Sequence, residues 1–380
     1  MMQEVARATR CAEPVSVGEH EDVVSSIVEL ARWAPSGDNS QPWRFEIISD
    51  DHVVVHAFDT RRHCVYDIDG QASQLAVGAM LETMRIAGTA HARTLTATRR
   101  IDSTEERPVL DVRLQTAAGL KPDPLVPFIR KRTVQRKPLS TRPLDQSAKA
   151  ELESALGPDY SLVWFEGPAK RLRLAWLAAR SAKIRLTTPE AYAVHRAVIE
   201  WDARFSDDKV PDQALGADAM TLRLMRWALK SWPRVQFLNR WCGGTYAPRL
   251  QLDFIPGLRC AAHFAIVARR APESIDDHMA AGGAVQRFWL TATRLQLQLQ
   301  PQYTPLVFAA YSRMKREFTS VLSARRRADE VAAEVSNLLG TQAARATVFM
   351  GRVGRGPAAV ARSLRLPLER LRWDADATPH

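Results

Sequence analysis

The chain has 380 residues, 46% of them hydrophobic, which is enough to bury the core of one large domain or of two ordinary ones. It contains no run of about 18 apolar residues, and this argues against a transmembrane helix. The four cysteines show neither a CxxC pair nor a histidine at metal-ligand spacing, so we expect no metal site and a reducing, cytoplasmic location.

The formal net charge of +11 has three interpretations: nucleic-acid binding, a solvated basic surface, and arginines that hold an anionic cofactor. The basic residues are spread along the chain and form no basic stripe interleaved with aromatic residues. We therefore expect no nucleic-acid partner.

Residues 1–20 carry scattered charges and no apolar signal segment, so we expect a flexible N-terminal tail. A helical pattern follows and ends at Pro35, because the residue before a proline is disfavoured in the α region. Residues 36–42 have loop chemistry. Alternation of apolar and polar residues from Trp43 then predicts a half-buried strand.

The first half, residues 21–122, is predicted to be an α+β unit. A second strand over 53–58 completes a hairpin, and apolar residues at three- and four-residue steps predict a helix over 70–88. Small residues in that helix would permit close packing. Two more strands are expected near 95–97 and 110–114.

A second unit is predicted over 123–380, opening on the basic segment 128–139. Arg132 and Arg136, entering a helix, could clamp a phosphate, since guanidinium groups form bidentate bonds to phosphate oxygens. A basic linker is the alternative interpretation.

The rest of the second unit mixes helices and strands. The helix over 282–295 echoes the 70–88 helix in position and glycine placement, a faint internal repeat. Helices are expected over 148–156, 170–184 and 282–295, and strands over 162–165, 262–268 and 347–355.

Residues 187–256 are rich in aromatic residues, with a helix expected over 212–232. Packing is the simplest role for these aromatics. An inserted lid whose aromatic lining selects the substrate is the second interpretation, and an amphipathic membrane-surface helix is the third. We expect no stable membrane association. The aromatics are Tyr192, Trp201, Phe205, Trp227, Trp232, Phe237, Trp241 and Tyr246.

The string Ala-Pro-Ser-x-x-Asn-x-Gln-Pro-Trp at residues 34–43 resembles a loop of the FMN-dependent nitroreductase superfamily. In that family the loop reaches across a two-fold interface to the flavin held by the other subunit. The resemblance implies that this loop contributes to a flavin site through four residues, Pro35, Ser36, Asn39 and Gln41.

The same resemblance assigns Arg132 and Arg136 to an Arg-x-Ser-x-Arg/Lys segment that grips the FMN phosphate. Val134 stands where the family has a hydroxyl, a departure for which Thr133 is the nearest substitute.

Three later segments are implied to complete the flavin site. Gln286, with Arg287 beside it, matches a family helix near the ribityl chain and pyrimidine edge; a buried helix face is the alternative. The backbone of Tyr303 and Thr304 would face flavin N5, where a plain turn is the alternative. A basic C-terminal segment would complete the phosphate site, or be only a basic tail; its candidates are Arg362, Ser363 and Arg365.

The resemblance implies an α+β, nitroreductase-like fold of the double-length branch. Two halves pack as a pseudo-dimer, with central antiparallel sheets flanked by helices and a helical lid inserted at 187–256. One FMN per chain is expected, because each family motif occurs once.

The implied activity is ping-pong hydride transfer from NAD(P)H through flavin N5 to a nitroaromatic, quinone or related small molecule, without a catalytic side chain. A flavin-dependent oxidase or dehydrogenase of a biosynthetic pathway, and a non-catalytic flavin-sequestering protein, are the alternatives. The chain could be a monomer or a homodimer.

Overall fold

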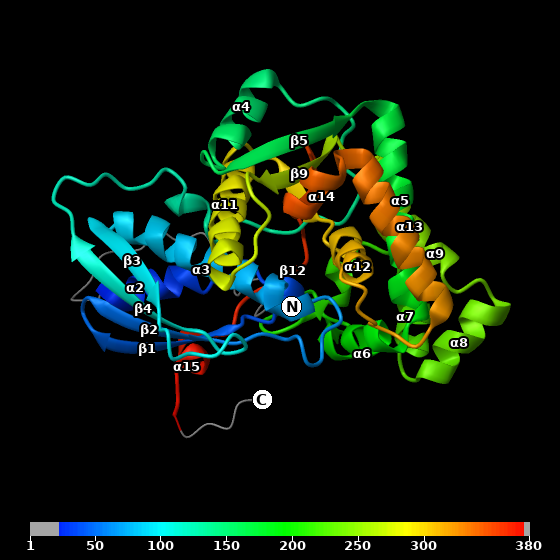
Figure 1. The fold of residues 1–380 in the computed structure, drawn as a ribbon, viewed down its shortest axis with the longest axis horizontal. Helices are drawn as coiled ribbons and strands as arrows, with labels where there is room; N and C mark the ends of the chain where they lie inside the picture. Colours follow the sequence, from blue (N-terminus) through cyan, green and yellow to red (C-terminus); the bar gives the residue numbers. More distant parts are fainter. Residues whose placement is uncertain (1–22, 376–380) are drawn as a thin grey trace, which may run out of the picture.

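The computed structural model describes residues 23–375, so the predicted N-terminal tail lies outside the described residues. Two four-stranded antiparallel sheets form the centres of two packed units (Figure 1). Their strand orders are β1-β2-β4-β3 and β10-β11-β9-β5. The α+β prediction with central antiparallel sheets is confirmed. Within residues 23–375, none of the helices combines the length and apolar character that a bilayer crossing requires.

The first sheet is covered on one face by two helices, whose apolar residues meet its inward side chains in one core. Trp43 and Phe45 alternate with Arg44 and Glu46 as predicted, and the two aromatic residues are fully buried. The elements are α2 (Val23–Ala31), β1 (Trp43–Ser49), β2 (His52–Ala57), α3 (Gln71–Thr89), β3 (Arg93–Arg99) and β4 (Val109–Thr116).

The second sheet is buried on both faces. Its inner strand β9 (Ala262–Ala268) is buried at six of its seven residues and is apolar except at His263, as a two-sided strand requires. One face packs on α11 (Ile275–Arg294), and the other packs on α5, α12 and α13. The remaining elements are α4 (Gln146–Ser154), β5 (Tyr160–Glu166), α5 (Gly167–Thr187), β10 (Gln298–Pro301), α12 (Thr304–Arg313), α13 (Leu322–Leu339), α14 (Thr341–Ala346) and β11 (Thr347–Gly354).

The two units meet where α3 crosses α11. Glycines allow the backbones to touch: a Cβ on Gly78 would lie 1.8 Å from the Met279 carbonyl oxygen, and one on Gly282 would lie 2.0 Å from that of Leu75. The two helices that resemble each other in sequence are therefore the ones that join the halves.

The segment between α5 and β9 is a helical extension at one end of the second unit (Figure 1). We call residues 187–256 the lid. Within it, helix α7 covers only Ala219–Ala228, so the helix predicted over 212–232 was too long. Its other elements are α6 (Pro189–Val198), β6 (Ile199–Glu200), β7 (Phe205–Ser206), β8 (Val210–Pro211), α8 (Trp232–Trp241), α9 (Tyr246–Pro248) and α10 (Ile255–Leu258), the last extending to residue 258.

The C-terminal residues return to the first unit, although the sequence placed them in the second. Strand β12 (Arg362–Ser363) pairs with β7 of the lid, and α15 (Leu368–Leu371) packs on β1 (Figure 1). The Trp373 amide donates to the Phe45 carbonyl oxygen at 2.8 Å, and its ring stacks on His56. This segment therefore ties both units and the lid together.

Two local predictions were wrong. The basic segment does not enter a helix: after a single turn at Val126–Phe128 it runs extended, with Val134 bridged to Leu299 and the Gln135 amide bonded to the Leu299 carbonyl. Pairing with β10 therefore sets an extended backbone in this segment. The sequence also predicted no strand at Gln298–Pro301, which is β10 and pairs with β11.

Candidate functional site

A cavity of about 810 Å³ lies between the first unit, the second unit and the lid. Its walls come from residues 35–40, 132–136, 300–305 and 361–365, together with the lid. Ten of the twelve predicted cofactor-binding residues line it: Pro35, Ser36, Asn39, Arg132, Arg136, Tyr303, Thr304, Arg362, Ser363 and Arg365. Residues up to 330 positions apart in the chain thus meet in one place.

The loop after α2 is held rigidly in an unusual backbone conformation. Asp38, Asn39 and Gln41 all have positive φ, which is uncommon for residues other than glycine. Side-chain bonds hold this conformation: the Ser36 hydroxyl accepts from the Gln41 amide at 3.0 Å, and the Asn39 side chain donates to the carbonyls of Asp207 and Lys209. Strain that is held in this way is common at binding sites.

Three arginines gather behind this loop. Arg132 and Arg365 are buried, and both donate to the backbone just before Pro35. Arg132 reaches the Trp33 carbonyl at 3.0 Å, and Arg365 reaches that of Ala34 at 2.8 Å. Arg362 lies beside them and donates to the carbonyl of Arg132 at 3.2 Å.

Within residues 23–375, two members of this group, Arg132 and Arg365, are buried without a carboxylate partner. Burial and the charges of Arg365 and Arg362 hold the pKa of Arg132 well below its usual value. Burial and the charges of Arg362 and Arg32 lower the pKa of Arg365 to about 9. Among residues 23–375, no carboxylate pairs with Arg132 or Arg365, and Nε of Arg132 is buried without a partner. Several cations that repel one another beside a cavity make a site for an anion.

Arg136 does not belong to this group. Its guanidinium donates to the Ala214 carbonyl at 3.1 Å, and its charged neighbours are Asp38 and Arg185. In an extended chain four residues span about 13 Å, whereas in a helix they span one turn. The extended backbone therefore separates Arg136 from Arg132, and the single clamp predicted from both is divided.

The turn before α12 presents backbone donors to the cavity. Tyr303 and Thr304 open this helix, and the first amides of a helix have no partner within it. In the described part of the chain, neither amide donates to another residue. The positive end of the helix dipole adds to their attraction for negative charge.

Two predicted residues do not line the cavity. The Gln41 side chain is fully buried and accepts from the Leu366 amide at 2.9 Å while donating to the Asp207 carbonyl, so it fixes the loop. Gln286 is buried at the helix crossing, where it donates to the Thr83 hydroxyl at 2.8 Å. Its neighbour Arg287 pairs with Glu82.

The lid contributes aliphatic walls. None of its eight aromatic residues named above lines the cavity, which contradicts the second interpretation, an aromatic lining, and several of them are exposed at the surface instead. The cavity wall from the lid includes Leu215, Leu224, Met225, Leu229, Leu238 and Leu252.

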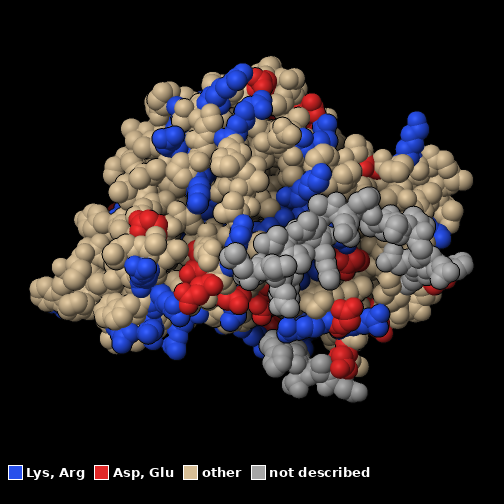
Figure 2. Space-filling model, turned by 180° about the vertical axis from the view of Figure 1, so that it is seen from behind, with Lys and Arg blue, Asp and Glu red and all other residues tan. Residues whose placement is uncertain are grey.

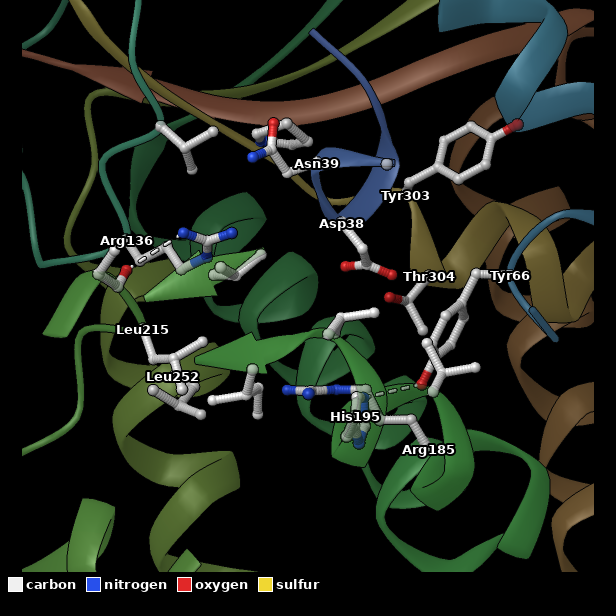
Figure 3. Close-up of a pocket in the computed structure, with 18 of the residues that line it drawn as sticks. Asp38, Asn39, Tyr66, Arg136, Arg185, His195, Leu215, Leu252, Tyr303 and Thr304 are labelled. Carbon is white, nitrogen blue, oxygen red and sulfur yellow. Dashed lines mark hydrogen bonds between the residues drawn. The ribbon is translucent and has the colours of Figure 1, made fainter. Parts of the chain in front are cut away.

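A second polar group was missed from the sequence. Asp38 points toward Thr304, beside Tyr66, and the Tyr66 hydroxyl bonds His195 Nε2 at 3.0 Å (Figure 3). Burial raises the pKa of Asp38, against the opposing charges of Arg136 and Arg185. Only Asp38 carried a usable signal, its place within the family-like loop; the other residues are brought together by the fold alone.

The part of the surface seen in Figure 2 shows no continuous basic stripe. On the face seen in Figure 2, Lys and Arg lie in several groups, with Asp and Glu between the lower ones.

A family model described as the nitroreductase family matches residues 17–108. This part of the chain is therefore similar to a nitroreductase-family domain. This segment holds the strained loop, the first sheet's leading strands and α3. A second α+β unit follows in the same chain, which fits a double-length member of the family.

Two relatives from Mycobacterium tuberculosis are similar over part of their length. An uncharacterized protein, MT1398, is 24% identical over 304 residues, which are 78% of this chain and 41% of the relative. The putative NAD(P)H nitroreductase acg is 44% identical over 68 residues, 17% of this chain and 20% of the relative. The matched part of this chain thus spans less than half the length of either relative.

Two solved structures are distantly similar. A nitroreductase-like family protein from Bacillus cereus has a TM-score of 0.33 and 13% identity, covering 67% of this chain and 97% of its own. The FMN-dependent nitroreductase NfnB from Mycobacterium smegmatis, in complex with NADPH, has a TM-score of 0.32 and 15% identity, covering 65% and 96%.

Proposed function

We propose that the cavity binds one FMN per chain and that the protein is an oxidoreductase. It would pass a hydride from NAD(P)H through the flavin to a neutral small-molecule acceptor. The observation that carries the proposal is the pair Arg132 and Arg365, because both guanidinium groups are buried beside the cavity and no carboxylate among residues 23–375 offsets them.

A phosphate monoester fits this group. The Nε of Arg132 has no partner in the described part of the chain, and guanidinium groups bind phosphate with charge-assisted bonds. A dianion there would also relieve the mutual repulsion that lowers the arginine pKa values. Arg362 and Ser363 extend the cavity wall formed by Arg132 and Arg365. We assign Arg136 instead to the polar group that contains Asp38 and Arg185.

The remaining walls suit a flat ring system. Bound flavin would supply reversible two-electron chemistry. The Tyr303 and Thr304 amides would stabilise negative charge that develops on a reduced ring, and the strained loop 35–40 would close the site from the first unit. The 21–122 and 123–380 halves would thus share one site, with the C-terminal residues crossing back.

The test compares FMN with riboflavin, which lacks the phosphate. Replacing Arg132 by Gln should weaken FMN binding by about tenfold to a hundredfold, the range for one charged hydrogen bond, while riboflavin affinity stays nearly constant. Arg130→Gln is the matched control, because Arg130 is paired with Glu29 and does not line the cavity. Equal affinity of the wild-type protein for both ligands would contradict the phosphate site.

Addition of NADPH to the flavin-loaded protein separates the enzyme from the flavin-sequestering alternative. Loss of the visible flavin absorbance under anaerobic conditions supports the reductase. Persistence of the absorbance with both NADPH and NADH would favour storage, because the lid lies over the cavity.

A further inference from the structure

We propose that Tyr66 is a catalytic proton donor to the acceptor and that His195 positions and re-protonates it; this rests on the proposed function. The two side chains come from separate parts of the chain, the loop before α3 and the lid helix α6. Both line the cavity, and their hydroxyl and Nε2 atoms are 3.0 Å apart (Figure 3).

The pair is built into a fixed position. The Tyr66 ring packs edge-on against Phe308, with ring centroids 6.4 Å apart, and it stacks loosely on His195 at 5.9 Å. Each ring is half-buried. The hydroxyl therefore faces the cavity while its ring is held by the core of the second unit.

The charged groups around the pair balance one another. Asp38 and Asp253 are offset by Arg136 and Arg185, and the Arg185–Asp253 pair is 2.8 Å long. With no net charge in this group and aliphatic walls from the lid, this end of the cavity suits a neutral ring compound that carries an oxygen.

Both members of the pair are neutral near pH 7. Burial and the charge of Arg185 lower the pKa of His195 to about 3, and burial raises the pKa of Tyr66 far above its usual value. The phenolic proton is therefore present throughout the physiological range. It is released only to an oxygen that gains negative charge during reduction.

The step balances for a quinone. Reduction to the hydroquinone takes up two electrons and two protons. Hydride transfer supplies both electrons and one proton, and the Tyr66 O–H bond breaks as a new O–H bond forms on the quinone oxygen. His195 returns a proton from Nε2 to the tyrosine oxygen, and its Nδ1 regains one from solvent.

The experiment follows re-oxidation of the dithionite-reduced holoprotein by two acceptors in a stopped-flow spectrometer. 1,4-Naphthoquinone needs the proton, whereas ferricyanide takes single electrons without one. Tyr66→Phe, which keeps the ring packing, should slow the quinone reaction by about a hundredfold or more and leave the ferricyanide reaction unchanged. His195→Gln should slow only the quinone reaction, by a smaller factor, and change its solvent isotope effect.

Tyr192→Phe is the matched control. Tyr192 lies on the same lid helix and donates to the Leu229 carbonyl at 3.3 Å, but it does not line the cavity. A binding readout accompanies the kinetics: calorimetric titration of the oxidised protein with 1,4-naphthoquinone, without reductant, should show about threefold to tenfold weaker binding for Tyr66→Phe only.

Two results would overturn the donor role: wild-type quinone rates in Tyr66→Phe, or equal slowing with both acceptors, which would indicate a disturbed flavin instead. A protein that binds no flavin overturns the proposed function and the donor role together. That failure is distinct, because it appears in the absorbance spectrum before any acceptor is added.

Discussion

One added methyl group at the crossing of α3 and α11 should force the two halves apart. In Gly282→Ala the new Cβ would start 2.0 Å from the Leu75 carbonyl oxygen, whereas ordinary contacts begin near 3.4 Å. The obstacle is backbone inside a helix, so it cannot rotate away as a side chain could. The helices would have to separate by about 1.4 Å.

The expected cost is large for so small a change. Overpacking a core costs about 1–3 kcal/mol, and a backbone clash lies at the upper end of that range. The gain in helix propensity from Gly to Ala offsets about 1 kcal/mol. We therefore expect the free energy of unfolding to fall by about 2 kcal/mol or more.

The neighbouring glycine is the control. A Cβ on Gly283 would lie 3.7 Å from the Glu82 Cβ, an ordinary contact, so Gly283→Ala should be neutral or stabilise by up to about 1 kcal/mol. Urea unfolding followed by circular dichroism measures both variants. Equal midpoints for Gly282→Ala and Gly283→Ala would refute the close crossing.

Three further predictions concern buried charges. Burial is the main cause that lowers the pKa of His195 to about 3 and that of His263 to about 4, so the unfolded chain binds more protons than the folded chain between about pH 6.5 and 4. The free energy of unfolding should therefore fall as the pH falls through this window, by up to about 1.4 kcal/mol per pH unit for each histidine. Urea titrations at several pH values measure this slope, which should be smaller in His195→Gln. Arg352→Met should lower the free energy of unfolding by about 3 kcal/mol or more, because the fully buried Arg352 guanidinium donates to three successive carbonyls of the basic segment. An unchanged urea unfolding midpoint would contradict that role. Arg287→Gln should lower the free energy of unfolding by about 2 kcal/mol, because it leaves the buried Glu82 with one fewer cation. A loss of the same size in low and high salt would argue against an electrostatic cause.

Local patterns predicted seven of the eight strands in the two central sheets and the helices α2, α3, α4, α5 and α11, but not the long helices α12 and α13. The loop before Trp43, the helix over 70–88 and the strand over 262–268 are fixed by neighbours in the chain, through proline geometry, helical spacing and an apolar run. Those signals depend on residues a few positions apart, and the predicted element forms when the tertiary packing favours the same local structure.

The wrong predictions share a cause. The basic segment 128–139 was expected to enter a helix, but its backbone pairs with β10 and is held by Arg352 from β11. That choice depends on residues more than 160 positions away, and no local window contains it. The aromatic residues of the lid also lie outside the cavity, because only the packed structure decides which face of a helix points toward the cavity.

The sequence by itself determined the family-like loop, the α+β halves and four of the arginines beside the cavity, because each is encoded within a short segment, whereas Arg185 was not predicted. Tertiary structure alone decided which arginines act together: Arg132 joins Arg365, and Arg136 joins Asp38. It also brought Tyr66 to His195. The physical reason is that charge coupling and hydrogen bonding depend on distance in space, which the returning C-terminal segment and the inserted lid set only when the chain is folded.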